Sequence, residues 1–174
     1  MKKIGVNGRR WLVGFHLFLA AVWVGTAFAM NLITFINGTT ANGDELYAAN
    51  AAVKLLDDWL IIPSALGCLF TGLLLSLLTH WGFFRFRWVT VKWALTVAFV
   101  LFGTFFLGPW TNEMTAIARA ERAGAWQNQI YLYDRRMVMV FGAVQTLLLA
   151  ATLFITVFRP WGKKNKPVAV ETGG

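Results

Sequence analysis

Four apolar segments of about 20 residues restrict this chain to one class of fold. They lie at residues 12–36, 59–79, 89–108 and 137–158. A helix rises about 1.5 Å per residue, so about 20 residues are enough to cross roughly 30 Å of hydrocarbon. Backbone polar groups in lipid must be hydrogen-bonded within the protein, and each segment therefore has to be a helix. We predict an all-α polytopic membrane protein, an antiparallel bundle of four transmembrane helices with helical outer loops.

The composition supports this class and excludes a soluble or disordered chain. Hydrophobic residues make up 57% of the sequence, and only 14% of its residues are charged. A typical soluble domain carries about 25% charged residues. The length of 174 residues suits one domain. We therefore expect a single four-helix transmembrane domain over residues 1–174 with a polar tail at 162–174, surrounded by a lipid bilayer. The one cysteine, Cys68, excludes an internal disulfide.

The charges are distributed unequally between the two sides of the predicted bundle. The amino-terminal arm, the second loop with the start of the third segment, and the tail carry a net charge of +10, whereas the other two loops carry −2. Loops rich in Lys and Arg stay in the cytoplasm. We predict a multi-pass protein of the plasma (inner) membrane with both termini in the cytoplasm. The total charge of +8 then reports orientation, and we expect no nucleic-acid partner.

The amino terminus also has the pattern of a secretory signal peptide, because basic residues precede an apolar run. That run continues to Ile36. A signal peptide has an apolar region of only about 7 to 15 residues. We therefore expect the run to stay in the protein as its first membrane helix.

Turn and breaker residues predict where the outer helices begin and end. Asn42-Gly43 is a turn signal, after which Asp44 can cap a helix that continues into the second segment. Pro63 is expected to kink that helix near its outer end. Gly108-Pro109 is expected to end the third segment.

Helical spacing gives each segment a polar stripe, which we expect to face the bundle interior because polar groups avoid lipid. The stripe of the first segment includes Asn31, and that of the fourth includes Gln145, Thr152 and Thr156. These side chains suit hydrogen bonds between helices. They equally suit a small-solute transporter or sensor with a polar interior, and the sequence leaves both interpretations open.

A ridge of small residues lies on the opposite face of the first segment, at Ala21, Gly25 and Ala29. Small side chains at this spacing let another helix approach closely. The ridge could therefore contact a second copy of the chain or a membrane partner, which makes a non-catalytic membrane subunit a further possibility.

His16 is the candidate with the most specific chemistry. It lies inside the first segment, where an ionisable residue is a functional candidate by default. Its imidazole can be an axial ligand of b-type haem iron, and Trp23, two turns further along, could form a wall for the macrocycle. The alternative is a histidine that hydrogen-bonds a neighbouring helix.

Four other ionisable residues leave two interpretations each. His80 is either a second haem ligand or an interfacial residue. Lys92 is either the counter-charge to a propionate or other anionic group, or a lysine that extends to the lipid headgroups. Asp57 and Asp58 could hold a cation but are interpreted as a solvated helix face. The chain has no nucleotide-binding glycine loop, hydrolase elbow or His/Cys/carboxylate metal motif, so whether it is an enzyme stays open.

Two resemblances add to this reading. The stretches 8–12, 71–82 and 88–92, with His16 and Gly25, resemble an uncharacterised bacterial family of predicted four-helix integral membrane proteins. More distantly, His16 with Trp23, Trp88 with Lys92, and the 159–161 Arg-Pro-Trp are similar to the haem-dependent protoporphyrinogen oxidase family and the copper-resistance membrane domains.

The second resemblance implies a haem-binding four-helix fold, in which His16 matches the first-span histidine and Lys92 the third-span lysine. Val24 to Phe28 stand where the oxidase family has a Tyr-Leu-Pro-Arg-Leu type of run. The resemblance therefore implies the fold rather than oxidase activity. Our expectation is a membrane protein that binds b-type haem near the cytoplasmic side for electron transfer or haem-linked oxidoreduction.

Overall fold

The computed structural model describes residues 4–79 and 86–158, without the side chains of residues 156 and 157. In these ranges the regular elements are all helical. In chain order they are α1 (Val6–Ile36), η1 (Asn37–Thr39), α2 (Gly43–Leu56), η2 (Asp57–Ile61), α3 (Ile62–Leu78), α4 (Arg87–Phe102), η3 (Gly103–Leu107), α5 (Gly108–Glu121), η4 (Arg122–Gln127) and α6 (Gln129–Phe158). The segments η1 and η4 are 3-10 helix, and η2 and η3 are π-helix.

Joined end to end, these elements form four helical runs that are long and apolar enough to cross a membrane: Val6–Thr39, Gly43–Leu78, Arg87–Gln127 and Gln129–Ile155. The predicted all-α class with four candidate membrane spans is confirmed. The second and third runs have 36 and 41 residues. They are longer than a bilayer requires, since about 20 residues suffice. Their surplus lies in α2 and α5, which pack against each other as the helical outer segments.

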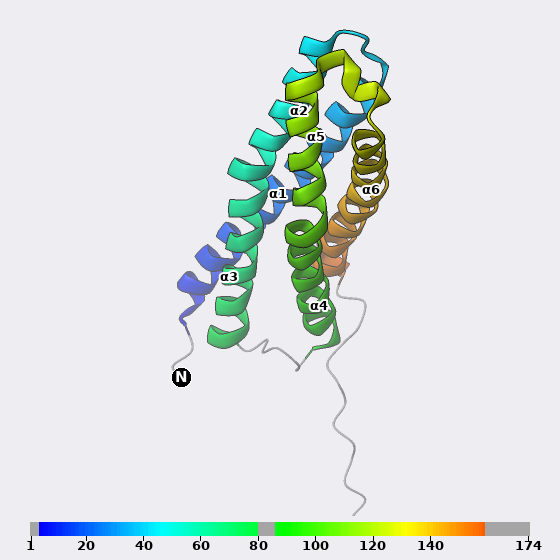
Figure 1. Cartoon of the computed structure of the whole chain (residues 1–174). Helices are drawn as coiled ribbons and strands as arrows, with labels where there is room; N and C mark the ends of the chain where they lie inside the picture. Colours follow the sequence, from blue (N-terminus) through cyan, green and yellow to red (C-terminus); the bar gives the residue numbers. More distant parts are fainter. Residues whose placement is uncertain (1–3, 80–85, 159–174) are drawn as a thin grey trace, which may run out of the picture.

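At each end of the molecule, a hydrogen bond connects two parts of the chain that are far apart in the sequence. At one end, called here the terminal end, the Ile4 backbone N–H donates to the Leu78 carbonyl across 3.1 Å. At the opposite or distal end, the Arg135 guanidinium donates to the Thr34 carbonyl across 2.9 Å. Figure 1 shows α1 beginning, α3 ending and α4 beginning at the terminal end, with α2 and α5 extending to the distal end.

The third helical run does not stop at Gly108-Pro109, where the sequence predicts a helix end. Instead α5 begins at Gly108 directly after the π-helical turn η3. Proline is tolerated in the first turn of a helix, because its missing N–H would have no intrahelical partner there. The wider π turn starts a new helical register just before the proline, so the chain continues as helix to Glu121.

The same arrangement occurs in the second run. The π-helical turn η2 begins at Asp57, six residues before Pro63, and η3 begins at Gly103, six residues before Pro109. The expected disturbance of the helix near Pro63 therefore takes the form of a π turn. π turns of this kind are frequent at functional sites.

The start of α2 also differs from expectation. Asn42 rather than Asp44 is the cap, because the Asn42 side-chain oxygen accepts the Asp44 N–H at 2.9 Å. Asp44 lies in the first turn and forms an ion pair with Arg122 at 3.3 Å. Gly43 lies so close to η4 that a Cβ at this position would overlap the backbone nitrogen of Ala123. A glycine is therefore required where α2 meets η4.

Two buried clusters hold the bundle together. The distal cluster joins α2, α5, η4 and α6 through Leu46, Met114, Ile117, Ala118, Ala125 and Tyr131. The central cluster joins α1, α3, α4 and α6 through Trp23, Ala65, Cys68, Phe99 and Leu149.

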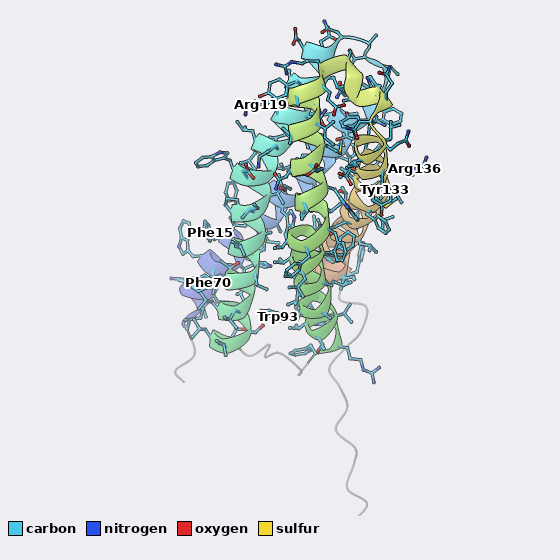
Figure 2. The ribbon with its side chains drawn as sticks, viewed as in Figure 1. Phe15, Phe70, Trp93, Arg119, Tyr133 and Arg136 are labelled. Atoms are coloured by element: carbon cyan, nitrogen blue, oxygen red, sulfur yellow. The ribbon has the colours of Figure 1, made fainter. Side chains whose placement is uncertain are left out.

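Most of the remaining apolar side chains face outward. Phe15 and Phe70 are 56% and 60% exposed, and Figure 2 shows both on the outer side of α1 and α3. A bilayer is the environment that accommodates so much exposed apolar surface. Figure 2 labels the charged residues Arg119 and Arg136 in the distal half, beyond these phenylalanines.

Candidate functional site

A cavity of about 330 Å³ lies between α1, α3 and α4 in the terminal half of the molecule. Its walls are mainly apolar, and its polar groups come from one histidine, one lysine, one cysteine, two hydroxyl side chains and two indoles. The lining residues are Val13, His16, Leu17, Cys68, Leu69, Gly72, Leu75, Ser76, Trp88, Val89, Lys92, Trp93 and Thr96. Cofactor pockets typically have volumes of about 300 to 1,000 Å³, apolar walls and a few polar groups. We call this space the histidine cavity.

The hydrogen bonds around His16 determine which of its ring nitrogens carries the proton. His16 Nδ1 lies 2.7 Å from the Thr71 hydroxyl oxygen. That hydroxyl donates its own hydrogen to the Gly67 carbonyl, also at 2.7 Å. The Thr71 oxygen therefore accepts a hydrogen bond from Nδ1–H. The Nε2 lone pair is left available, which is the state in which an imidazole binds a metal.

Neighbouring residues of α3 fix the position of the His16 ring without covering it. Nε2 makes no hydrogen bond to any residue that the structure describes. A Cβ added at Gly72 would lie 3.6 Å from His16 Cε1, an ordinary contact distance, so this part of α3 lies directly beside the ring. Cys68 is buried, and its Sγ lies 3.8 Å from the His16 carbonyl oxygen. The imidazole is thus held from one side and borders the cavity on the other.

The opposite wall comes from the first two turns of α4. Trp88 and Val89 are each 7% exposed, and Lys92 follows one turn later on the same wall. Trp93 Nε1 donates to the Ser76 hydroxyl at 2.9 Å, which links α4 to α3, and Figure 2 shows Trp93 between these two helices. The structure therefore brings the two residues of greatest interest in the sequence, His16 and Lys92, to one cavity.

The residues around this cavity suit a haem group in their chemistry. An imidazole nitrogen with a free lone pair can bind iron, a cation can pair with a propionate, and apolar and indole side chains can pack against the macrocycle. One axial ligand is available in the described part of the chain. His80, which the sequence leaves open as either a second ligand or an interfacial residue, lies outside the described residues. Within the described residues there is also no cluster of three or more His, Cys, Asp or Glu side chains.

Trp23 does not line the histidine cavity. It is 4% exposed in the central cluster and borders a second cavity of about 70 Å³, nearer the distal end. Among the other residues bordering this second cavity are Asn31, Asp57, Gln145 and Thr146, together with parts of η2 and η3. The two cavities share no lining residue.

The predicted polar interior is distributed between α1 and α6. Asn31 donates to the Thr146 hydroxyl at 2.9 Å and so forms the expected kind of hydrogen bond between helices. Thr152 is buried and donates to the Leu149 carbonyl in its own helix at 2.7 Å. Thr156 lies in α6, but its side chain is outside the described part of the chain.

The small-residue ridge of α1 faces away from the other helices. Ala21 and Gly25 are exposed, and Ala29 is half-buried. A Cβ added at Gly25 would have no atom within 4 Å. The ridge therefore makes no close helix contact within the described chain.

Two residues with important positions were not identified as site residues from the sequence. Thr71 lies 55 residues from His16 and acts as its hydrogen-bond partner. Asp57 was interpreted as part of a solvated face together with Asp58. Asp58 does pair with Lys54 at 2.9 Å on the surface, whereas Asp57 borders the second cavity. Pro63, six residues further along, was the one available signal, because a proline disturbs the regular helix before it, and the π turn begins at Asp57.

The fold and the histidine cavity together define a class: an all-α chain with four helices suited to a bilayer and a cavity bordered by a histidine and a lysine. No protein-family model, curated protein or solved structure matches the chain.

Proposed function

We propose that this chain is an integral membrane protein that binds b-type haem in the histidine cavity, with His16 as axial ligand. One observation supports this most directly. His16 Nδ1 is hydrogen-bonded to Thr71, whereas Nε2 has no hydrogen-bond partner among the described residues and its ring borders a largely apolar cavity. Hydrogen-bonding one imidazole nitrogen so that the other can bind iron is the usual way in which proteins orient a haem ligand.

Lys92 supplies the second element of the proposal. Its side chain borders the same cavity as His16 and comes from a different helix. A haem has two propionates, and a nearby ammonium group would stabilise one of them at the cavity wall. Trp88, next to Lys92 in the cavity wall, would pack its indole against the macrocycle.

The charge distribution indicates how the site is oriented in the cell. The net charge of +10 carried in the sequence by the amino-terminal arm, the second loop with the start of the third segment, and the tail favours the cytoplasm for both chain termini. The histidine cavity would then lie in the cytoplasmic half of the inner membrane. Haem supplies one-electron chemistry, and in this position the protein would serve electron transfer or haem-linked oxidoreduction. The protein's own residues would orient the group and exclude water from it.

An absorption spectrum of the purified protein tests the proposal. After expression with added haem, the reduced-minus-oxidised spectrum should show Soret and alpha bands. His16→Ala should lose them, since the iron loses its axial nitrogen. Leu17→Ala is a matched control, because Leu17 borders the same cavity but has no ligand atom. Wild-type protein that is folded and haem-supplied but lacks these bands would refute haem binding, and so would a His16→Ala variant with unchanged bands.

A further inference from the structure

The second cavity lies where the two π-helical turns meet the interior of the bundle. Asp57 and Ile61 of η2 border it, as do Gly103 and Leu107 at the two ends of η3. Each turn precedes a proline, so two breaks in regular helix converge on one small space. Irregular helix inside a membrane protein is tolerated where it is buried or lines a polar cavity.

Trp23 borders this cavity, and its indole N–H has no hydrogen-bond partner among the residues that the structure describes. Trp23 is 4% exposed, and its Nε1 is buried with no acceptor among the described residues. An indole nitrogen is a donor only, so it requires an acceptor atom. Buried donors are almost always paired with protein or with ordered water.

Two further polar groups border the same cavity without partners in the described part of the chain. The Asp57 carboxylate and the Gln145 amide form no hydrogen bond or ion pair with any described residue. The nearest cation in the sequence, Lys54, is paired with Asp58 at 2.9 Å. The cavity is therefore bordered by three residues with complementary polar groups. The Trp23 indole is a donor, the Asp57 carboxylate has two acceptor oxygens, and the Gln145 amide can both donate and accept.

The volume of the cavity agrees with hydration. It measures about 70 Å³, and one water needs roughly 10 to 15 Å³ of such volume together with two to four polar partners. Water would satisfy all three groups, because it can accept from Trp23 Nε1 and donate to Asp57 or Gln145. A metal cation would leave the indole N–H unpaired.

We propose that this cavity is a hydrated proton-binding site, in which Asp57 accepts the proton and Trp23 and Gln145 hold the water that delivers it. In the binding step, a proton passes from a water molecule to the Asp57 carboxylate, which becomes a neutral carboxylic acid, and bulk water replaces that proton. The residues bordering the cavity from α1, η3, α5 and α6 include no other ionisable side chain among those described. On its own helix Asp57 is near Lys54 and Asp58. The site operates without a haem in the histidine cavity.

Radical footprinting in lipid nanodiscs tests the hydration. Hydroxyl radicals formed from bound water should oxidise Trp23 several-fold faster in the wild type than in Ala27→Leu, which fills the cavity. Ala21→Leu is the control, because it places the same side chain on the exposed face of α1 and should leave the rate unchanged. Equal rates of Trp23 oxidation in the wild type and in folded Ala27→Leu would show a dry cavity and overturn the proposal.

Infrared spectroscopy of the full chain tests the protonation. As the pH is lowered, the wild type should gain, among the bands of its eight Asp and Glu residues, one carboxylic C=O band that Asp57→Asn lacks and Asp58→Asn retains. Asp57→Asn and Asp58→Asn both keep the size of the side chain. This infrared comparison can therefore be made even if Ala27→Leu does not fold. A band that is absent from the wild type or unchanged in Asp57→Asn would refute the site. Neither measurement requires haem, so failure here is separate from failure of the haem spectrum.

Discussion

Thr71 shows how much a single hydroxyl determines at the residue scale. Its oxygen accepts the His16 Nδ1–H at 2.7 Å while its hydrogen is donated to the Gly67 carbonyl. The pair fixes both the tautomer and the orientation of the ring. The sequence shows only that His16 lies in a membrane helix. The hydrogen bond to Thr71 occupies Nδ1 and leaves Nε2 available to a ligand in the cavity.

Replacing Thr71 with Val should weaken haem binding by about 10- to 100-fold, the usual effect of losing the hydrogen-bond partner of a metal-bound histidine. Valine has the shape of threonine but no oxygen to accept the Nδ1–H. Haem titration followed at the Soret band measures the affinity. Thr71→Ser keeps the hydroxyl and should bind nearly as well as the wild type. Equal affinities for the Val and Ser variants would show that this hydrogen bond has no part in ligation.

At the scale of elements, the helical run that contains Pro109 departs most from what its sequence predicts. A Gly-Pro pair after an apolar segment usually indicates a helix end, yet α4, η3 and α5 form one run through Pro109. The π turn accommodates the proline, and the packing of α5 against α2 and α6 keeps the following residues helical. The local sequence predicts that a proline disturbs the helix. Whether the helix ends there or continues depends on the elements that pack against the residues after the proline.

The contact between α2 and η4 gives a testable constraint on element packing. Gly43→Ala should destabilise the protein by about 1 to 3 kcal/mol, a typical cost of overpacking, because the added Cβ meets the Ala123 backbone rather than a movable side chain. Thermal unfolding in detergent would show a lower melting temperature.

Gly14→Ala is the control for this substitution. Gly14 is exposed on α1, and a Cβ there would meet no atom within 4 Å. Its melting temperature should stay the same or rise slightly. If Gly43→Ala unfolds at the wild-type temperature, the close approach of α2 to η4 is not rigid.

For the whole molecule, the exposed apolar belt determines the environment. Phe70 is 60% exposed near the middle of α3. Phe70→Lys should reduce the amount of folded protein recovered from membranes, since a lysine at the centre of a membrane helix costs about 2.5 to 3.5 kcal/mol in insertion. Phe70→Leu keeps the position apolar and should be recovered like the wild type. Equal recovery of the Lys and Leu variants would show that this face does not contact lipid.

The class of fold could be predicted from the sequence because it depends on properties of each segment taken separately. Segment length and the scarcity of charge at 14% require helices that cross a bilayer, whatever their arrangement. His16 and Lys92 were identified for the same reason, as ionisable residues inside apolar segments. Which residue neighbours which could not be predicted in this way, because it depends on how the helices rotate and tilt against one another.

The sequence by itself determined four apolar helices, the asymmetric charge and the two ionisable residues of greatest interest. Only the tertiary structure decided that His16 and Lys92 border one cavity, that Thr71 orients the imidazole, and that Trp23 lies instead in a second cavity with Asp57. The physical reason is that bilayer insertion depends on each segment separately. A cavity depends on packing between helices and on the π turns, which change the direction of every side chain beyond them.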